Sequence, residues 1–453
     1  MIRTIVAILT VLPAAFAARA QSSAEVNAGI QYNFSSPGAR SLGRAGAFIA
    51  DASDATAAYA NPAGLVNLPT REMSIEGRAS EFVNAYSASG HAFGPPSGVG
   101  NDTVSGIQTG RSANHVNNVS FASVVFPLER FLSARRLTIA AYRHELANFA
   151  ASQATRGVFF DATDPQTGQR IPGYREYPAV SSLRLRIAGE GIALALRASP
   201  RFSLGAGLRL YQSTIDSVTR RYGTQGGTGD PDYSDLQIIQ RQHGRGTSIG
   251  INAGALIDLT PKLSFGASYR QGFSFPVAVD YSDFVPYNAS PQVPGNQERA
   301  RPTQTGAFNV PAFYGVGTSF RPTDNWSIAA DVNRITYSDT TRGFVNLFAE
   351  EPRYFVPDGT EIRLGSELLL TRDRFAALPF PISIAGGVWR DPDHSIRAAD
   401  PADAQAVFFR KTSADIHVTG GLGILLGTKA QLHAAVDHSS RQTVVSMSAM
   451  ARF

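Results

Sequence analysis

The sequence predicts an all-β protein: a transmembrane antiparallel β-barrel of about 14 strands, with a small N-terminal hatch of short helices that plugs the lumen. Three observations support this fold class. Apolar and polar residues alternate over segments of ten or more residues, long connections alternate with very short turns, and charged residues make up only 17% of the 453 residues. A typical soluble domain carries about 25% charged residues. The low value therefore indicates a partly apolar exposed surface.

The chain begins with a segment that has the features of an export signal. Arg3 gives a short positive start, the stretch from Ile5 to Phe16 is mostly apolar, and residues 18–20 (Ala-Arg-Ala) form a small-residue cleavage site. The apolar stretch is too short for a membrane anchor, which needs about 20 residues. We therefore expect residues 1–20 to be a secretory signal peptide and the mature chain to begin near Gln21.

Composition excludes several other classes of protein. Loss of Arg3 and Arg19 with the signal peptide lowers the formal charge from +5 by two, to +3. No run of lysine or arginine is present to track a phosphate backbone, so we expect no nucleic-acid partner. Cysteine is absent, so disulfides do not stabilise the protein. No later run approaches 18 apolar residues, which leaves a periplasmic protein, a secreted protein or an outer-membrane barrel.

Residues 202–211 and 263–275 show the alternation most clearly. In the first segment the apolar residues occupy every second position from Phe202 to Leu210. In the second segment they occupy every second position from Leu263, and this pattern is expected to include Phe273 and Phe275. Period-two alternation indicates a strand with one apolar and one polar face. Strands of a soluble sandwich usually have about 5 to 6 residues, whereas strands of about ten residues are needed to cross a bilayer. The length therefore favours a membrane barrel.

The same pattern gives 14 expected strands, an even number. They are 71–89, 116–126, 135–150, 182–198, 201–219, 247–259, 262–282, 306–321, 326–338, 362–371, 380–390, 414–426, 429–440 and 443–453. The long connections are 90–115, 151–181, 220–246, 283–305, 339–361 and 391–413, and turns such as 199–200 and 427–428 lie between them. Long outer loops and short periplasmic turns are typical of outer-membrane barrels.

The last strand supports closure of the barrel. In residues 443–453, Val445 and Met447 share the expected lipid-facing parity, whereas Ser446 and Ser448 share the lumen-facing one. A last strand that pairs with the first removes the open sheet edge, which hydrocarbon does not tolerate. The terminal Phe453 resembles the C-terminal signature that barrel-assembly machineries bind, so that machinery is an expected partner.

The segment from Gly38 to Leu65 is rich in alanine and glycine and fits neither a strand nor a domain. A barrel of about 14 strands has a lumen that its own side chains do not fill, so a plug is expected. Gly43 and Gly46 allow tight turns and close backbone packing, and Phe48 and Tyr59 provide packing anchors. We therefore assign residues 21–70 to the hatch and residues 71–453 to the barrel.

A short helix is expected within this hatch, over about residues 54–60. Ser53 or Asp51 is the expected N-cap. The helix must stop before Pro62, because the residue that precedes a proline is disfavoured in helical geometry.

Signals for catalysis or metal binding are weak. The histidines show no paired zinc-ligand spacing, and no G-x-S-x-G nucleophile motif is present. The glycines of 421–427 lie in a strand pattern and lack dinucleotide-loop spacing. Asp391, Asp393 and His394 form either a cation site or, as we expect, part of a solvated loop. We expect no enzyme, no cofactor and no metal.

The hatch segment GARSLGRAGAFIADASDATAAYANPAGL closely resembles the N-terminal hatch of the FadL/TodX family of outer-membrane transporters for long-chain fatty acids and aromatic hydrocarbons. Asn61, Pro62 and Ala63, followed by Gly64, match the family's Asn-Pro-Ala hallmark. The resemblance extends through residues 259–270, 309–339, 361–370 and the final strand. It implies a location in the outer membrane of a Gram-negative bacterium, and passive uptake of hydrophobic compounds, with outer-membrane lipids as neighbours.

In this family, ligands are captured by outer loops, enter an apolar lumen pocket and leave sideways beside a kinked third strand, against which the Asn-Pro-Ala segment lies. The corresponding strand here is 135–150, where His144 and Glu145 interrupt the alternation. That interruption indicates either a kink or an ordinary strand entering its loop. Lateral exit agrees with the free-energy cost of moving an apolar solute through a polar pore.

The substrate class stays open between fatty acids and aromatic hydrocarbons. Arg209 and Arg270 fall on the lumen-facing parity, where they would meet a fatty-acid carboxylate or pair with acidic neighbours. Three other roles for the protein remain: an accessory or shuttle barrel of a protein secretion system, an outer-membrane lipid hydrolase, and a general hydrophilic porin.

Overall fold

The computed structural model of the chain describes residues 24–32, 34–132, 135–163, 170–225, 227–285, 297–342, 354–371, 378–399, 404–409 and 411–453. The expected signal peptide, residues 1–20, and the expected start of the mature chain at Gln21 lie outside these ranges. Among the helices of the described residues, none combines the length and the apolar character that a membrane-crossing helix needs.

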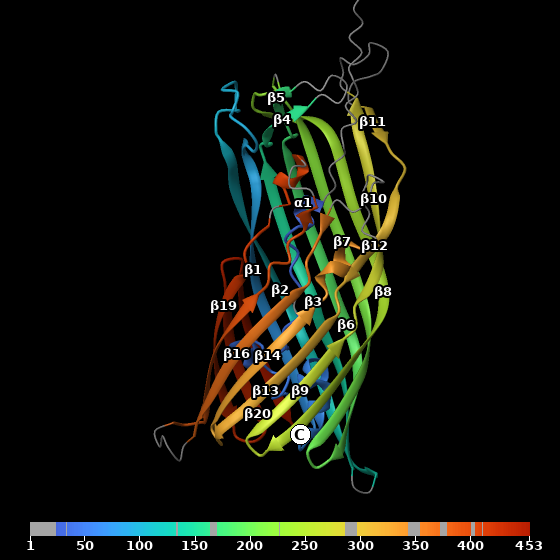
Figure 1. Cartoon of the computed structure of the whole chain (residues 1–453). Helices are drawn as coiled ribbons and strands as arrows, with labels where there is room; N and C mark the ends of the chain where they lie inside the picture. The colour runs from blue at the N-terminus through green and yellow to red at the C-terminus, as the bar shows by residue number, and fades with distance from the viewer. Residues whose placement is uncertain are drawn as a thin grey trace, which may run out of the picture.

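The chain forms a closed antiparallel barrel of 14 wall strands, as the sequence predicted (Figure 1). The first and last strands pair from Glu72 opposite Arg452 to Phe82 opposite Gln442, which closes the sheet. Two wall strands are each built from two consecutive segments. In chain order the wall consists of β1 (Glu72–His91), β2 (Gly106–Leu132), β3 (Arg135–Thr155), β6 (Ala179–Ser199), β7 (Phe202–Thr224), β8 (Pro231–Thr260), β9 (Leu263–Arg270) with β10 (Phe273–Val285), β12 (Gln304–Val310) with β13 (Phe313–Thr323), β14 (Trp326–Ile335), β16 (Gly359–Leu370), β17 (Ile382–Asp391), β19 (Asp415–Leu426), β20 (Ala430–His438) and β21 (Gln442–Arg452).

The wall is taller on one side than the sequence indicated. Strands β1 to β3, β6 to β8 and β10 rise far above β14 to β20 (Figure 1). The expected loop 220–246 is therefore mostly strand, because β7 continues to Thr224 and β8 begins at Pro231. Apolar alternation marks only the part of a strand that lies in the bilayer, and the backbone ladder continues beyond it.

Smaller elements complete the outer end of the barrel. The strands β4 (Phe159–Thr163), β5 (Arg170–Arg175) and β11 (Gln297–Ala300) extend the rim, and β15 (Tyr354–Phe355) pairs with β18 (Arg397–Ala398) as a separate two-stranded sheet. Two 3-10 helices, η2 (Tyr337–Thr341) and η3 (Ala404–Val407), lie in the connections.

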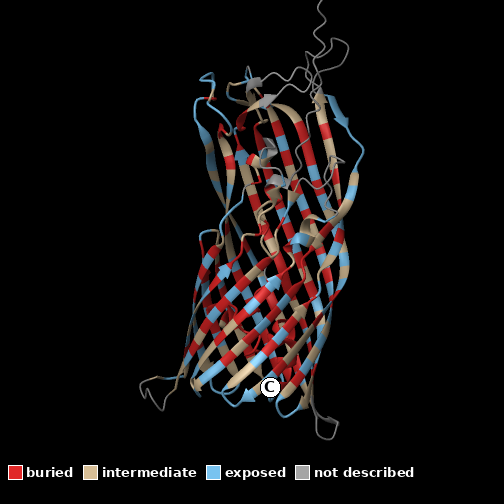
Figure 2. Cartoon of the chain, viewed as in Figure 1, coloured by how far each residue is buried: buried red, intermediate tan, exposed pale blue. Residues whose placement is uncertain are grey.

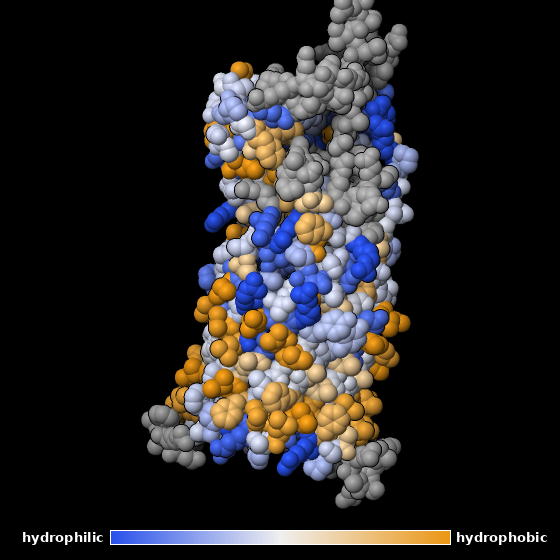
Figure 3. Space-filling model, in the orientation of Figure 1, coloured by the Kyte–Doolittle hydropathy of each residue, from blue (hydrophilic) through white to orange (hydrophobic). Residues whose placement is uncertain are grey.

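The two faces of the wall differ as the alternation predicted (Figure 2). On β7, Leu208 is 52% exposed on the outside, whereas the neighbouring Arg209 is 2% exposed in the lumen. On the face that Figure 3 shows, hydrophobic side chains form a band across the lower half of the barrel, below a zone with many hydrophilic side chains. This band is the apolar belt that a bilayer requires. On β14 the belt ends at the exposed Arg334, where the register is continuous and no bulge occurs.

The expected lipid-facing parity of Phe273 and Phe275 is wrong. The wall strand is interrupted at Gln271 and Gly272, between β9 and β10, and side chains of the same parity point inward beyond that break. Phe275 is 2% exposed, and Phe273 stacks on Tyr211 with ring centroids 4.0 Å apart. Both rings therefore contribute to the lumen and not to the belt.

The N-terminal segment lies inside the barrel. Its elements are α1 (Ala24–Asn27), α2 (Ala39–Gly43), α3 (Ala57–Ala60) and the 3-10 helix η1 (Pro62–Asn67). All residues from 41 to 52 are buried, and the small side chains allow this packing. The segment is short-helical and fills the lower lumen, as expected for a hatch.

The helix expected over 54–60 is shorter than predicted and is capped differently. Its N-cap is Thr56, whose backbone N–H and hydroxyl donate to Asp54, and neither Ser53 nor Asp51 caps it. Asp51 is engaged in ion pairs instead. The predicted stop before Pro62 is confirmed, because Asn61 is extended with φ −154° and ψ 99°.

Candidate functional site

The hatch rests on glycines that face the lumen, one from each of β7, β8, β9, β13, β16, β17 and β19. A Cβ atom built on any of them would lie within 3.1 Å of a hatch atom. We call this set the glycine ring; it consists of Gly205, Gly254, Gly266, Gly317, Gly365, Gly387 and Gly421. Three pairs are direct cross-strand neighbours: 205 with 254, 266 with 317, and 365 with 387. Hatch and wall thus meet at backbone distance along these seven strands, which leaves no space for a solute between them at the glycines.

The hatch glycines named from the sequence take part in this close packing. Gly43 lies against Gly421 of β19, with its Cβ position 3.0 Å from the Gly421 Cα. Gly46 has φ +70°, a conformation that glycine adopts without strain, and its Cβ position lies 2.7 Å from the Arg363 guanidinium. A Cβ on Gly64 would overlap Ala52. A side chain at Gly64 would therefore collide with hatch backbone, and one at Gly46 would be strained by the positive φ.

Asn61 ties the hatch to itself and to the wall. Its Nδ2 donates to the Ile49 carbonyl at 2.8 Å and to the Ala255 carbonyl of β8 at 3.1 Å, and its Oδ1 accepts the Ala63 N–H at 3.2 Å. The side chain is fully buried. Pro62 packs against Gly205 and Gly254 of the glycine ring. The Asn-Pro-Ala segment therefore lies on β7 and β8.

Charged groups fix the other side of the hatch. Arg44 Nη1 lies 2.6 Å from Asp51 Oδ2, and Arg321 of β13 lies 2.6 Å from Asp51 Oδ1. Arg40 pairs with Glu367 of β16 at 2.7 Å. Burial alone would raise the pKa of Asp51, but the Arg44, Arg40 and Arg321 guanidinium groups hold it below its usual range. The buried carboxylate thus stays ionised and links hatch to wall.

Phe48, a predicted packing residue, lies between these cations. It is fully buried, and the guanidinium carbons of Arg40 and Arg44 lie 5.7 Å and 5.8 Å from its ring centroid. The Phe48 N–H donates to Asp331 of β14 at 2.8 Å. Its ring and its backbone are therefore both fixed.

Tyr59 is the hatch residue around which the predicted arginines gather. Its ring stacks on His144 of β3 with centroids 3.7 Å apart and meets Tyr142 edge-on at 6.4 Å. The Arg209 and Arg270 guanidinium carbons lie 5.6 Å and 4.6 Å from the same ring, within cation–π range. The structure thus brings together three residues that the sequence named separately.

Both arginines face the lumen, as their parity predicted, but they bind protein groups. Arg209 Nη2 donates to the Ile251 carbonyl at 3.1 Å, and Arg270 Nη1 donates to the Phe34 carbonyl at 2.9 Å. Among the described residues, neither forms an ion pair with a carboxylate. The pairing with acidic neighbours weighed from the sequence is therefore absent from the described part of the chain, and aromatic rings and carbonyls take its place.

The wall has a break above this cluster, between β2 and β3. Backbone pairing of the two strands runs only as far as Phe121 opposite His144, although β3 continues to Thr155 against β6. A register shift against β6 between Glu145 and Ala147 marks a bulge. The interruption that the sequence shows at His144 is thus a deformation of the wall and not the start of a loop.

We call the unpaired region, residues 116–120 of β2 and 145–150 of β3, the wall window. Side-chain hydrogen bonds close it partly: Asn118 Nδ2 donates to Glu145 Oε1, and at the upper edge Ser152 Oγ donates to Asn114 Oδ1 at 3.1 Å. An enclosed cavity of about 60 Å³ lies on its lumen side, lined by Asn118, Glu145 and Phe82 among others. The local sequence of β3 indicates the bulge, but it does not indicate that backbone pairing with β2 ends there.

A larger cavity of about 480 Å³ lies higher in the lumen, between α1, β1, β3 and the outer connections. Its lining combines apolar groups with cations. The apolar residues include Val26, Phe82, Ala151, Ile396 and Phe408, and the cations are Arg111, Lys411 and Arg441. No sequence motif marks these residues, which come from distant parts of the chain.

The loop cluster after β17 is a network of protein contacts. Asp393 accepts the N–H groups of Ser395 and Thr412, each at 3.0 Å, and pairs with Arg397 at 2.7 Å. His394 stacks on Tyr337 with centroids 4.5 Å apart. Among the described residues, no group of three acidic, histidine or cysteine side chains has metal-binding geometry.

The C-terminal residue lies beside the start of β1, where the hatch segment joins the wall. Phe453 is 58% exposed, and its N–H donates to the Arg71 carbonyl at 3.1 Å. Val445 and Met447 face outward, and Ser446 and Ser448 face the lumen, as predicted.

Comparisons with known proteins agree with this architecture. Residues 181–347 match the family model described as outer membrane protein transport protein (OMPP1/FadL/TodX). No curated protein matches the chain in sequence. A structure of a Pseudomonas aeruginosa FadL homologue is similar at 15% identity, with a TM-score of 0.62, covering 92% of this chain and 98% of that one.

Two further solved structures are similar over almost the full barrel. The Ralstonia pickettii toluene transporter TbuX shares 15% identity with a TM-score of 0.57, covering 93% of this chain and 99% of its own. The P. putida toluene transporter TodX shares 13% identity with a TM-score of 0.54, covering 92% and 98%. The chain is therefore an outer-membrane β-barrel with the fold of the FadL/TodX transporters, and it resembles the OMPP1/FadL/TodX family in sequence over residues 181–347.

Proposed function

We propose that this protein moves hydrophobic compounds passively across the outer membrane: the outer loops capture the compound, the apolar lumen holds it, and it leaves sideways through the wall window. The observation that carries the proposal is the loss of pairing between β2 and β3 above Phe121 and His144. This break stands above a hatch that the glycine ring brings into close contact with seven wall strands.

The lumen above the hatch favours an apolar solute. Buried apolar side chains form one continuous cluster there, contributed by α1, β1 to β3, β6, β7, β10, β12, β13 and β14 among others. Phe82, Val116 and Ala147 belong to this cluster and also line the small cavity behind the window. These three residues would give a hydrophobic compound apolar contacts at the window, beside polar side chains such as Asn118 and Glu145.

Exit through the floor is disfavoured by the same reasoning. The groups below the glycine ring are strongly polar: a cavity of about 270 Å³ at the periplasmic end is lined by Arg40, Asp54, Glu367, His433 and Arg452 among others. An apolar solute loses the benefit of burial on entering such a site. Passage through the window leads instead toward the outer surface of the wall.

Residues 21–70 would then act as a permanent floor, and Asn61, Pro62, Ala63 and Gly64 as its anchor on β7 and β8. Tyr59, two residues before Asn61, is the hatch residue that contacts the lower edge of the window. We propose that the Asn-Pro-Ala segment controls passage through Tyr59, because it fixes the end of the helix that carries this ring.

The substrate class follows from the cavities. TbuX and TodX are described as toluene transporters. In this chain the upper cavity also contains Arg111, Lys411 and Arg441, which would neutralise a carboxylate, so the proposal covers fatty acids as well as aromatic hydrocarbons. Arg209 and Arg270, each at most 3% exposed, would meet a carboxylate only after Tyr59 moved.

Mass spectrometry of hydrophobic molecules that co-purify with the barrel tests the substrate class. Recovery of fatty acids or aromatic compounds would support the proposal. In an Arg111→Ala/Lys411→Ala variant, the amount recovered should fall for compounds that carry a carboxylate and stay unchanged for the others. Recovery of secretion proteins with no uptake defect on deletion would favour an accessory role. Phospholipid turnover abolished by a single Ser→Ala change would favour a hydrolase.

A further inference from the structure

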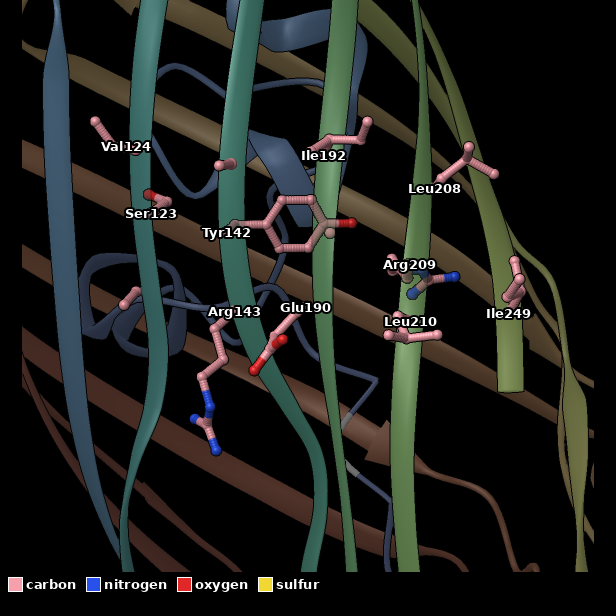
Figure 4. Close-up of a pocket in the computed structure, with 13 residues that line it drawn as sticks. Ser123, Val124, Tyr142, Arg143, Glu190, Ile192, Leu208, Arg209, Leu210 and Ile249 are labelled. Carbon is pink, nitrogen blue, oxygen red and sulfur yellow. The ribbon is translucent and has the colours of Figure 1, made fainter. Parts of the chain in front are cut away.

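The outer surface of β2, β3, β6, β7 and β8 has a groove just below the wall window. Its volume is about 720 Å³, and apolar side chains dominate its lining (Figure 4). Val124, Ile192, Leu208, Leu210 and Ile249 supply the outward-facing apolar surface. These residues belong to the apolar belt, so hydrocarbon chains of the bilayer are in contact with the groove.

Arginines stand just above the groove, on the side of the outer loops. The upper row of the groove is formed by Glu190, Leu210 and Ile249, which are cross-strand neighbours on β6, β7 and β8. Four residues further along these strands, the register places Arg186, Thr214 and Arg245 side by side on the same outward face. This row lies about 13 Å along the strands from the groove, because a strand rises about 3.3 Å per residue.

The charges in this row are available to a ligand. Arg245 is exposed and has no ion-pair partner among the described residues. The Arg186 side chain is 56% exposed, with Glu145 at 3.5 Å as its neighbour. In the next row outward, Arg184 is likewise exposed and unpaired within the described chain, beside Asp216 of β7. Glu190 and Asp216 flank the row but do not occupy it.

From the groove and the arginine row we infer that this face binds one phosphorylated acyl lipid of the outer leaflet, with an acyl chain in the groove and a phosphate between Arg186 and Arg245. Guanidinium groups bind phosphate oxygens in a bidentate manner, and the Thr214 hydroxyl between them adds a donor. Basic groups immediately beyond an apolar belt are the recognised setting for anionic lipid headgroups. The occupant is a membrane lipid because the site faces the bilayer and not the lumen.

Native mass spectrometry of the full-length barrel in non-ionic detergent tests this inference, with bisphosphorylated lipid A as the probe. We expect the wild-type barrel to retain one lipid molecule and the Arg186→Ala/Arg245→Ala variant to bind it roughly 25-fold more weakly, since each surface arginine near an anionic headgroup contributes a factor of about five. The Arg186→Lys/Arg245→Lys variant should keep most of the binding. Lys429→Ala, at an exposed turn on the periplasmic end, is the matched control and should bind like wild type.

Two further probes identify the source of the phosphate. Dephosphorylated lipid A should bind the wild type as weakly as the double-alanine variant, and inorganic phosphate at millimolar concentration should not displace the lipid. Equal lipid binding by wild type and double-alanine variant, binding independent of the lipid phosphates, or displacement by free phosphate would each overturn the inference. Heat-modifiable migration of each variant verifies that the barrel is folded.

The lipid site and the transport route are separable. The variant that separates the two is Arg245→Ala, which removes no ion pair of the described residues and should take up hydrophobic compounds like the wild type, whereas Arg186 contacts Glu145 of the wall window at 3.5 Å. A failed lipid-binding test would therefore leave the proposed transport function untouched.

Discussion

The Tyr59 ring of the hatch stacks on the His144 ring of β3, with centroids 3.7 Å apart and planes inclined by 20°. His144 is also the last residue of β3 whose backbone pairs with β2. The floor of the lumen is thus joined to the wall at the lower edge of the window. A change in one is transmitted directly to the other.

Replacing Tyr59 with alanine should loosen the hatch near the window. The fully buried ring contacts Tyr142, His144 and two arginines, and loss of a buried aromatic side chain costs about 3 kcal/mol. Hydrogen exchange of residues 54–66 should become faster by two orders of magnitude, while the barrel strands stay protected. Tyr59→Phe keeps the ring and serves as the control. Equal exchange rates in the two variants would mean that the Tyr59 ring does not hold the hatch in place.

The close packing of the hatch on the glycine ring can be tested with a neighbouring glycine as the control. Gly387 faces the hatch, and its Cβ would lie 2.8 Å from the Ala45 Cβ, whereas the nearest atom to a Cβ on Gly386 is 3.8 Å away. Gly387→Val should displace the hatch at a cost of about 1–3 kcal/mol and produce ion conductance in planar bilayers. Gly386→Val should remain as closed as the wild type. Low conductance in both variants would argue against a seal at this level.

Deletion of residues 38–65 tests the plug as a whole. The barrel closes through β1 and β21 without this segment, so it should still assemble. Without the hatch, we expect a large and steady ion conductance where the intact protein shows little. Conductance equal to that of the intact protein would mean that another part of the chain closes the lumen.

The outer loop after β17 should depend on pH through Asp393. Burial opposes its ionisation, but hydrogen bonds from Ser395 and Thr412 and the Arg397 guanidinium lower the pKa of Asp393 to about 2. Because the pKa of Asp393 is lower in the folded loop than the usual aspartate value near 4, its ionisation stabilises the folded loop above pH 4. This stabilisation is lost as the pH falls through 2. Hydrogen-exchange protection of the Thr412 amide should therefore drop about tenfold or more between pH 4 and pH 2. Asp393→Asn should show no such drop.

Much of the barrel could be predicted because period-two alternation reports directly which side of a strand meets lipid. Leu208 and Arg209, on opposite faces of β7, illustrate this. The prediction for Phe273 was wrong because the break at Gln271 and Gly272 reverses which positions face lipid, while the apolar residues continue in the same alternation. The upper part of β8 was missed because most of its residues are polar and its few apolar ones do not alternate: Ile238 and Ile239 are adjacent and both buried.

The site was predictable only in part, because it depends on contacts between distant residues. Asn61 and Pro62 are visible as a motif, and His144 as an interruption. Gly387 is an ordinary strand glycine until the hatch backbone is placed against it. The window needs the register of β2, which no property of β3 reveals.

The most direct measurement of the central claim is uptake through a window that has been closed covalently. The chain contains no cysteine, so Asn118→Cys/Glu145→Cys introduces a single reversible disulfide across the window. The control pair Ser181→Cys/Thr219→Cys joins β6 to β7, whose backbones are paired there. Oxidation should stop uptake of a hydrophobic compound only in the window variant, and reduction should restore it. Uptake that continues with the window disulfide fully formed would contradict lateral exit.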